Sequence, residues 1–460
     1  MKIIDGSFRD PQANVYISDN RIFRVINDIG KEKFDFLTNS SVLKKSIENK
    51  YLIDTWIPEK KTLPNFFKEK IILEHKRIPF TSYPYEWCFS QLKDSAVHHL
   101  IFQIFLLENN IQLTDSSAYN IQFIGSKPMF IDFFSLNFYK EGDFWYGQKQ
   151  FYEQFLNPLL LSSLKNISFN NWYKGSLEGI KNTEILSLLN FFEKFYPSIF
   201  FHTYLPTFFD KKINSDKIKN KNFFNKGNFK KNNYLWILNN LKNTISNLKP
   251  PKTYSYWESY EKTSSYEDKD SLIKSEIVKE FIARTKPDIV ADLGCNTGYY
   301  SELCLNNGCK YVVGFDYDIA SVEKCYSRSI EKKLNFLPLF FDAANPSSSI
   351  GWFENERYGF LKRAKFDASL FLAFEHHLII GKNIPIESFI KWATLIGSRG
   401  LIEFVPKTDR MIKIMLNLKG DIFPDYNEEN FLSILKKYSK VIKINEIGSM
   451  GRKIIEFDAS

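Results

Sequence analysis

Short apolar runs alternate with helix-like segments over residues 286–343, and this alternation is the clearest pattern in the chain. Three of the runs have the length and the branched or aromatic content of buried strands: DIVADLG, YVVGFDYD and LNFLPLFFDA. The segments between them, YYSELCLNNG and IASVEKCYSRSIEKK, have helical spacing. The order strand, helix, strand, helix, strand predicts a parallel sheet with helices on both faces.

The pattern of buried strands continues toward the C-terminus. FDASLFLAFEHH and GLIEFVP have the composition of two further strands. In the final stretch, SKVIKINEIGSMGRKIIEFDA, apolar and polar positions alternate on both sides of a turn that contains glycine. This alternation predicts a hairpin that closes one edge of the sheet antiparallel to the other strands.

The first half of the chain has a mixed α+β pattern. GSFRDPQANVYISDNRIFRVI predicts an early hairpin, and QLKDSAVHHLIFQIFLLENN predicts one long apolar helix. The runs IQF and MFI flank a glycine and predict two short strands joined by a turn.

A change of composition divides the chain into three segments. Residues 1–205 form the first unit, and residues 206–255 form a Lys/Asn-rich insertion with a connector helix. Residues 256–460 form the second unit, after Pro250 and Pro251, which cannot continue a helix interior. The connector helix is predicted from apolar residues at steps of three and four, namely Leu235, Ile237, Leu238, Leu241, Ile245 and Leu248.

Composition and charge narrow the class of protein. With 460 residues, 44% of them hydrophobic and 25% charged, the chain is long enough for two globular domains. No run of eighteen apolar residues occurs, and the first residues lack a basic region followed by an apolar one, so we expect a cytoplasmic protein without a membrane span. The five cysteines include no CxxC pair, which favours reduced thiols over disulfides or a zinc site.

The net charge of +9 comes largely from one segment. Residues 211–231 carry eight lysines and one aspartate. Such a run can follow a phosphate backbone, so a nucleic-acid partner stays open, but a solvated insertion is the favoured interpretation.

The loop DLGCNTG carries the most specific chemistry. It follows the first strand of the predicted sheet, where open parallel sheets bind ligands. Gly294 and Gly298 let the backbone approach a ligand closely, and Asp292 can accept a hydrogen bond. Asp316 ends the second strand, where an acidic residue can bind both hydroxyls of a ribose, and Asp342 ends the third.

DLGCNTG, GFDYD and FFDA, in this order, resemble the motifs of class I S-adenosylmethionine-dependent methyltransferases, which have a Rossmann-like sheet with a terminal antiparallel hairpin. The resemblance covers residues 256–460. It implies S-adenosyl-L-methionine as the cofactor, with Asp316 at the ribose and Asp342 at the adenine. It further implies that the methionine part lies against Asp292, Gly294, Asn296 and Gly298.

Residues after the fourth predicted strand are candidates for the acceptor side of the reaction. His376 and His377 could serve as a base, with Glu375 as an orienting partner. Hydrogen bonds to the backbone or a helix cap would be the structural alternative for both histidines. The polar segment before that strand could wall the acceptor site, or form surface ion pairs, through Trp352, Glu356, Arg357 and Arg363.

A second polar cluster is predicted in the first unit, from TDSSAYNIQFIGSKPMFIDFF. The two short strands around the glycine turn would bring Asp115, Asn120 and Asp132 to one edge. Two carboxylates and an amide oxygen suit Mg²⁺ and the phosphates of a nucleotide such as ATP, and one carboxylate could accept a hydroxyl proton. An ordinary hairpin with polar edge residues is the alternative.

The cluster resembles the catalytic and metal loops of protein-kinase-like and aminoglycoside-phosphotransferase-like domains. That resemblance implies Asp115 as catalytic base and Asn120 and Asp132 as metal ligands. The repeated glycines of a kinase phosphate loop and the lysine of its third strand are missing, and Arg24 is the nearest basic residue.

Motifs from both halves, including IPFTSYPYEWCFSQLKDSA, DSSAYNIQF and AFEHHL, resemble a bacterial family of large methyltransferases related to nodulation proteins (NoeA-like). Within this resemblance, Tyr85, Glu86 and Trp87 would border a nucleotide or acceptor pocket, or simply pack as aromatics.

Three functions follow from these patterns. The first is a methyltransferase whose acceptor, a small molecule, a glycan or another group, the sequence does not identify. The second is a bifunctional kinase and methyltransferase, and the third is a non-catalytic scaffold with a degenerate kinase-like module.

Overall fold

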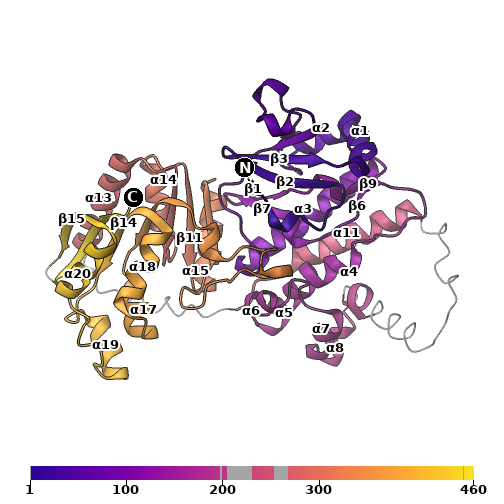
Figure 1. Ribbon diagram of the computed structural model, residues 1–460. Coiled ribbons are helices and arrows are strands. Elements are labelled where there is room, and N and C mark those ends of the chain that lie inside the picture. The colour runs from indigo at the N-terminus through magenta and orange to yellow at the C-terminus, as the bar shows by residue number, and fades with distance from the viewer. Residues whose placement is uncertain (1, 197–198, 205–229, 253–267, 449) are drawn as a thin grey trace.

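The computed structural model describes residues 2–196, 199–204, 230–252, 268–448 and 450–460. Its strands form two large sheets, one from each half of the chain, and two small two-stranded ladders. Figure 1 shows the N-terminal half, in indigo to magenta, beside the C-terminal half, in orange to yellow.

The C-terminal sheet has seven strands in the order β12-β11-β10-β13-β14-β16-β15. Neighbours from β12 to β14 are parallel, whereas β16 is antiparallel to both β14 and β15. This arrangement confirms the predicted parallel sheet and its closing hairpin. The strands are β10 (Ile289–Leu293), β11 (Tyr311–Asp316), β12 (Phe336–Phe340), β13 (Phe366–Phe371), β14 (Gly397–Phe404), β15 (Lys440–Ile447) and β16 (Arg452–Asp458).

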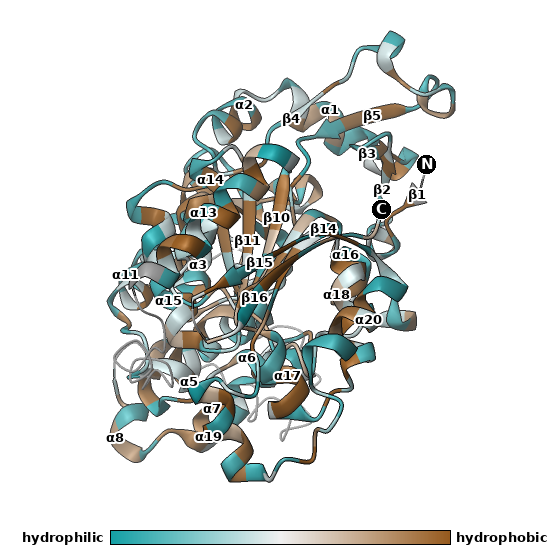
Figure 2. Cartoon of the chain, turned by 90° about the vertical axis from the view of Figure 1, so that its left-hand side faces the viewer, coloured by the Kyte–Doolittle hydropathy of each residue, from teal (hydrophilic) through white to brown (hydrophobic). Residues whose placement is uncertain are grey.

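Helices follow the parallel strands and cover the sheet. Every residue of β11 is buried, as expected for a strand with both faces covered. Figure 2 shows these strands as a largely brown, hydrophobic layer among helices whose outer faces are mostly teal. The helices are α13 (Asp268–Thr285), α14 (Tyr299–Asn306), α15 (Ile319–Glu331), α16 (Phe360–Arg363), α17 (Glu375–Lys382), α18 (Ile386–Ile396), α19 (Arg410–Lys419) and α20 (Glu428–Tyr438).

The N-terminal sheet is antiparallel throughout and has the order β1-β2-β3-β5-β4. Its strands are β1 (Lys2–Ile3), β2 (Ala13–Ser18), β3 (Arg21–Ile26), β4 (Thr55–Trp56) and β5 (Ile71–His75). The predicted early hairpin is confirmed as β2 and β3, which turn at Asp19 and Asn20, both with positive φ. Helices α1 (Lys31–Asn39) and α2 (Ser41–Glu48) lie between β3 and β4.

A mainly helical region follows β5. The predicted long helix is confirmed as α3 (Phe89–Glu108). After it, β6 (Ile111–Leu113) pairs with β9 (Leu136–Phe138), and the predicted short hairpin is β7 (Ile121–Ile124) with β8 (Lys127–Phe130). The further α-helices of this region are α4 (Gln148–Phe151), α5 (Asn157–Lys165), α6 (Asn170–Gly175), α7 (Asn182–Leu188) and α8 (Phe191–Lys194).

The connector helix is confirmed as α11 (Lys231–Asn247), which packs along α3. Its apolar stripe faces inward, because Leu238, Leu241 and Ile245 are fully buried while Trp236 on the other side is 61% exposed. Most of the basic run, residues 211–229, lies outside the described residues.

The two halves meet along the β12 edge of the C-terminal sheet. The Gln91 side chain of α3 donates a hydrogen bond to the main-chain oxygen of Pro338 at 3.0 Å, so a polar group of the edge strand is paired. Tyr326 of α15 donates to Asp94 at 2.8 Å, and the rings of Phe80 and Phe366 stack at 5.5 Å. The halves are therefore joined by buried contacts.

All five cysteines are buried free thiols, as expected. None of the helices in the described ranges is long and apolar enough to cross a membrane. Within those same ranges, no three His, Cys, Asp or Glu side chains are grouped so that they could hold a metal ion.

Candidate functional site

The loop after β10 begins with a buried carboxylate. Asp292 is 2% exposed, and its Oδ2 accepts a hydrogen bond of 2.7 Å from the Ser301 hydroxyl on α14. Burial raises the pKa of Asp292 to about 6, against the opposing effects of the Ser301 hydrogen bond and the Lys274 charge. The group can therefore change its charge near neutral pH.

Two glycines give the loop its shape. Gly294 and Gly298 have φ of +77° and +80°, in the left-handed region that other residues rarely adopt. A Cβ at Gly294 would lie 2.8 Å from the Phe374 ring, and one at Gly298 would lie 2.8 Å from the Phe336 ring. Both the backbone conformation and the packing of these aromatic rings therefore require glycine at these two positions.

Asp316 joins the end of β11 to this loop. Its carboxylate accepts hydrogen bonds from the main-chain nitrogens of Asn296 and Asp318, each at 2.8 Å. Burial raises its pKa to about 6, against these two hydrogen bonds and with a smaller effect in the same direction from the charges of Asp318 and Asp292. Asp292, Asn296 and Asp316, which the sequence assigned to one ligand, therefore lie together.

Asp342 follows β12 and begins the next loop. Its Oδ1 accepts a hydrogen bond of 3.0 Å from the Ala344 nitrogen, and its main-chain oxygen accepts one of 3.0 Å from the Asn345 nitrogen. A narrow cleft lies beside it, between the end of β12 and residues of the N-terminal half. These residues include Tyr85 and Glu86, whereas Trp87 is fully buried in the core.

These strand ends fit a nucleoside-containing cofactor. The carboxyl ends of β10, β11 and β12 are adjacent in the sheet, and one of the three predicted aspartates lies at or just after each end. Asp316 lies at the end of β11, where an acidic residue can bind ribose hydroxyls, and this role stays a prediction. The donor and acceptor set matches the one that the sequence predicted.

The two candidate histidines lie at the start of α17. His376 Nδ1 is 3.0 Å from Glu375 Oε2, as expected for an orienting partner. Glu375 is fully buried, and its Oε1 accepts hydrogen bonds from the Val405 nitrogen and the Tyr426 hydroxyl. Burial, reinforced by the neighbouring His376, lowers the pKa of His377 well below its usual value, which keeps the ring neutral. A role as base stays a prediction for both.

The segment between β12 and β13, which the sequence analysis suggested as one side of the acceptor site, contacts the N-terminal half. Arg363 pairs with Glu86, and Arg9 pairs with Glu356 through two hydrogen bonds of 2.8 and 3.0 Å. The Arg357 guanidinium lies over the Tyr119 ring at 4.7 Å. Figure 1 shows this orange segment reaching toward the N-terminal half. Of the ion pairs expected within this segment, Arg357 lies 3.9 Å from Glu356, whereas Arg363 forms its buried pair with Glu86 of the N-terminal half instead.

The second polar cluster lies around the predicted hairpin of β7 and β8, and Asp115 follows β6, a strand that the sequence analysis did not predict. Asp115 Oδ1 accepts a hydrogen bond of 2.9 Å from the Ser117 nitrogen. Burial raises the pKa of Asp115, the Asp132 charge raises it further, and a hydrogen bond with Asn120 opposes the shift. The three candidate residues of this cluster are therefore neighbours.

The guanidinium of Arg24 lies beside the carboxylates of this second polar cluster. Arg24 Nη1 on β3 lies 2.9 Å from Asp132 Oδ1 and 3.6 Å from Asp10 Oδ2. Lys33 of α1 donates to the main-chain oxygen of Phe134 at 2.5 Å, and burial lowers its pKa. The sequence analysis missed Lys33 and Asp10, because their approach depends on how α1 and the β1–β2 loop fold over the cluster.

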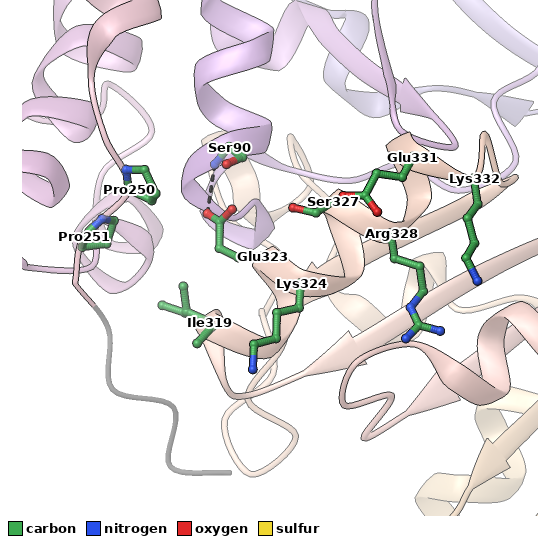
Figure 3. A pocket seen from close by; sticks show the side chains of 11 residues that line it. Ser90, Pro250, Pro251, Ile319, Glu323, Lys324, Ser327, Arg328, Glu331 and Lys332 are labelled. Atoms are coloured by element: carbon green, nitrogen blue, oxygen red, sulfur yellow. Dashed lines mark hydrogen bonds between the residues drawn. The ribbon is translucent and has the colours of Figure 1, made fainter. Parts of the chain in front are cut away.

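A pocket of about 590 Å³ lies between α15 and the connector (Figure 3). Pro250 and Pro251 form one side, and Glu323 of α15 accepts a hydrogen bond of 3.0 Å from the Ser90 nitrogen. Arg328 and Lys332 are ion-paired with Glu302. None of the predicted site residues lines this pocket.

Comparison with known proteins identifies relatives of the whole chain. The chain is 38% identical over 460 residues to nodulation protein NoeA of Rhizobium meliloti (strain 1021). The alignment covers 99% of this chain and 96% of that protein. The chain belongs to the NoeA family. No protein-family model matches this NoeA-family chain.

More local similarities involve methyltransferases. The NoeA-family chain is 33% identical over 134 residues to the tRNA U34 carboxymethyltransferase of Helicobacter acinonychis (strain Sheeba), covering 26% of this chain and 47% of that protein. Among solved structures, magnesium protoporphyrin IX methyltransferase (ChlM) from Synechocystis PCC 6803 with bound SAH aligns over 42% of this chain and 84% of its own, at 16% identity and a TM-score of 0.31.

The N-methyltransferase NodS from Bradyrhizobium japonicum WM9 aligns over 42% of this chain and 98% of its own. Its sequence identity is 9% and its TM-score is 0.31. TM-scores this low leave the fold to be judged from the sheet topology of the chain itself.

Proposed function

We propose that this NoeA-family chain is a methyltransferase that uses S-adenosyl-L-methionine as its methyl donor. The observation that carries the proposal is the placement of Asp292, Asp316 and Asp342 at the carboxyl ends of three adjacent parallel strands. The left-handed backbone of the first loop at Gly294 and Gly298 supports it. The sheet order, with an antiparallel hairpin at one edge, agrees with the resemblance drawn from the motifs.

Each residue of the loop region has a proposed part in binding. Asp316 would accept hydrogen bonds from the ribose hydroxyls, and Asp342 would face the adenine. The methionine part would lie against the loop backbone at Gly294 and Gly298, beside Asp292 and Asn296. When bound, S-adenosylmethionine supplies an activated methyl group, so the protein's main task is to align the acceptor with it.

Proton removal from the acceptor is proposed for the histidines of α17. The place of both rings at the start of α17, after the fourth parallel strand, supports this role, whereas the lowered pKa of His377 makes that ring the weaker proton acceptor. Glu375 would hold His376 through the contact of 3.0 Å with Nδ1. The acceptor can be a small molecule, a glycan or another group, and the partial relatives leave a nucleic-acid acceptor open to test.

The first experiment is calorimetric titration of the full chain with S-adenosylhomocysteine, the product form of the cofactor. We expect micromolar binding, about 8 kcal/mol, by the wild type. An Asp316→Ala variant should lose it, because its ribose contact is removed. Absence of binding by folded wild-type protein would refute the proposal.

We further propose that residues 1–205 form a kinase-like domain, joined by the connector of residues 206–255 to the methyltransferase domain of residues 256–460. The meeting of Asp115, Asn120 and Asp132, with Arg24 on the third strand of an antiparallel sheet, supports this proposal. It keeps phosphoryl transfer from ATP with Mg²⁺ as a second candidate activity.

The second activity has its own test. Under the bifunctional hypothesis, Asp115→Ala should abolish transfer of phosphate from ATP while S-adenosylhomocysteine binding stays unchanged. Absence of any ATP turnover by the wild type, across a panel of hydroxyl-bearing acceptors, would count against it.

A further inference from the structure

The cleft beside Asp342 is built from both halves of the chain. The C-terminal side consists of Phe340, Asp342 and Asn345, at and after the end of β12. The facing side consists of Tyr85 and of Lys174 on α6. The strand end that the proposed function gives to adenine is therefore covered by the N-terminal half.

Lys174 forms hydrogen bonds across this cleft, from the N-terminal half to the C-terminal half. Its Nζ donates hydrogen bonds to the main-chain oxygens of Asn345, at 2.8 Å, and Pro346, at 3.4 Å. These carbonyls belong to the loop that begins at Asp342. In that loop, Asp342 accepts hydrogen bonds from the main-chain nitrogens of Ala344 and Asn345. The lysine is half-buried, and the charges of Asp342 and Glu86 act on it, so it lies within the electrostatic range of both carboxylates.

Helix α6 is itself held firmly in place. Asn170, which is 2% exposed, donates to the main-chain oxygens of Tyr85 and Trp87, each at 2.9 Å. The side chain of Glu86, between these two residues, pairs with Arg363 of the C-terminal half. The position of Lys174 relative to the loop is thus fixed from both halves.

We propose that Lys174 is a positioning residue for the adenine end of the cofactor site, supplied by the N-terminal half and acting through the loop of residues 342–346. This inference rests on the proposed function. The ammonium fixes two consecutive carbonyls, and with them the amides and the carboxylate that face the base. Loss of the lysine would let this loop relax. Recognition of the base would then weaken more than the contact between the two halves of the chain.

The test is calorimetric titration of the full chain with S-adenosylhomocysteine and with its inosine counterpart, in which a carbonyl replaces the adenine amino group. We expect the wild type to prefer the adenine form. Lys174→Met should bind S-adenosylhomocysteine about tenfold more weakly, the size of one lost charged hydrogen bond, and should show a smaller preference between the two ligands. Lys174→Arg should restore both, because arginine can also donate to two carbonyls.

A matched control is available on α3. Lys93 also donates to a main-chain oxygen of another segment, that of Leu248 at 3.0 Å, and it does not line the cleft beside Asp342. Lys93→Met should leave the affinity and the preference unchanged. Unchanged affinity and preference in Lys174→Met would overturn the inference while the proposed function stands. Failure of the wild type to bind S-adenosylhomocysteine would instead overturn both.

Discussion

Arg363 and Glu86 form a buried ion pair between the two halves of the chain. Their side chains are 3% and 5% exposed, and Nη2 and Oε1 are 2.5 Å apart. The guanidinium also donates to the main-chain oxygen of Thr81 at 2.6 Å and lies over the Tyr83 ring at 4.5 Å. The remaining carboxylate oxygen of Glu86 accepts from the Tyr83 nitrogen at 2.9 Å. Both charges are therefore well satisfied without water.

Removing one partner of this pair should destabilise the protein strongly. Arg363→Met leaves the Glu86 carboxylate buried without its cation, which typically costs about 3–5 kcal/mol. Replacing both partners, as Arg363→Met with Glu86→Leu, should recover much of this loss. The free energy of unfolding from urea titration measures the effect. Equal stability of the single variant and the wild type would show that the pair contributes nothing.

Cofactor binding should weaken as the pH falls through about 6. Burial raises the pKa of Asp316 to about 6, so this carboxylate is ionised above that pH and protonated below it. An ionised carboxylate accepts two hydroxyl hydrogen bonds, whereas protonation turns one oxygen into a donor. Titration calorimetry with S-adenosylhomocysteine between about pH 5 and pH 8 should show the loss on the acid side.

Asp292 titrates in the same range, with a pKa of about 6, so it contributes to the same profile. Asp316→Asn should bind more weakly at every pH and keep only the part of the profile due to Asp292. A flat profile in the wild type would contradict the assignment of Asp316 to the ribose.

Mg²⁺ should not raise the melting temperature of the wild-type chain. Arg24 already neutralises Asp132 at 2.9 Å, and it also lies 3.6 Å from Asp10. Arg24→Met should free both carboxylates and produce a melting temperature that increases with millimolar Mg²⁺. Adding Asp132→Asn to that variant should abolish the response. If Mg²⁺ raised the melting temperature of the wild type, and Asp132→Asn removed this increase, the metal would displace Arg24 from Asp132.

Two substitutions on α11 test whether the connector belongs to the core of the N-terminal half. Leu238 is fully buried against α3, so Leu238→Ala should cost about 2–5 kcal/mol of unfolding free energy. Trp236, on the same helix, is 61% exposed, and Trp236→Ala should change stability by less than about 0.5 kcal/mol. Equal effects of the two changes would contradict the packing of this helix.

Local periodicity was enough to predict most elements of the C-terminal sheet. The strands around Asp292, Asp316 and Asp342 follow from short apolar runs, and parallel pairing places their ends together. The hairpin β7–β8 was predictable for a similar reason, since a glycine turn joins its two runs. Trp87 shows the limit of such patterns, because a residue that a motif placed at a pocket is buried in the core.

The sequence by itself determined the seven strands of the C-terminal sheet, the helices α3 and α11 and the acidic residues at the strand ends, because these depend on spacing within short segments. Only the tertiary structure decided which distant side chains meet, as in Arg24 with Asp132, Lys174 with the Asn345 carbonyl and Arg363 with Glu86. The physical reason is that such contacts depend on how two separately folded surfaces are oriented. The spacing of apolar and polar residues along the chain does not determine that orientation.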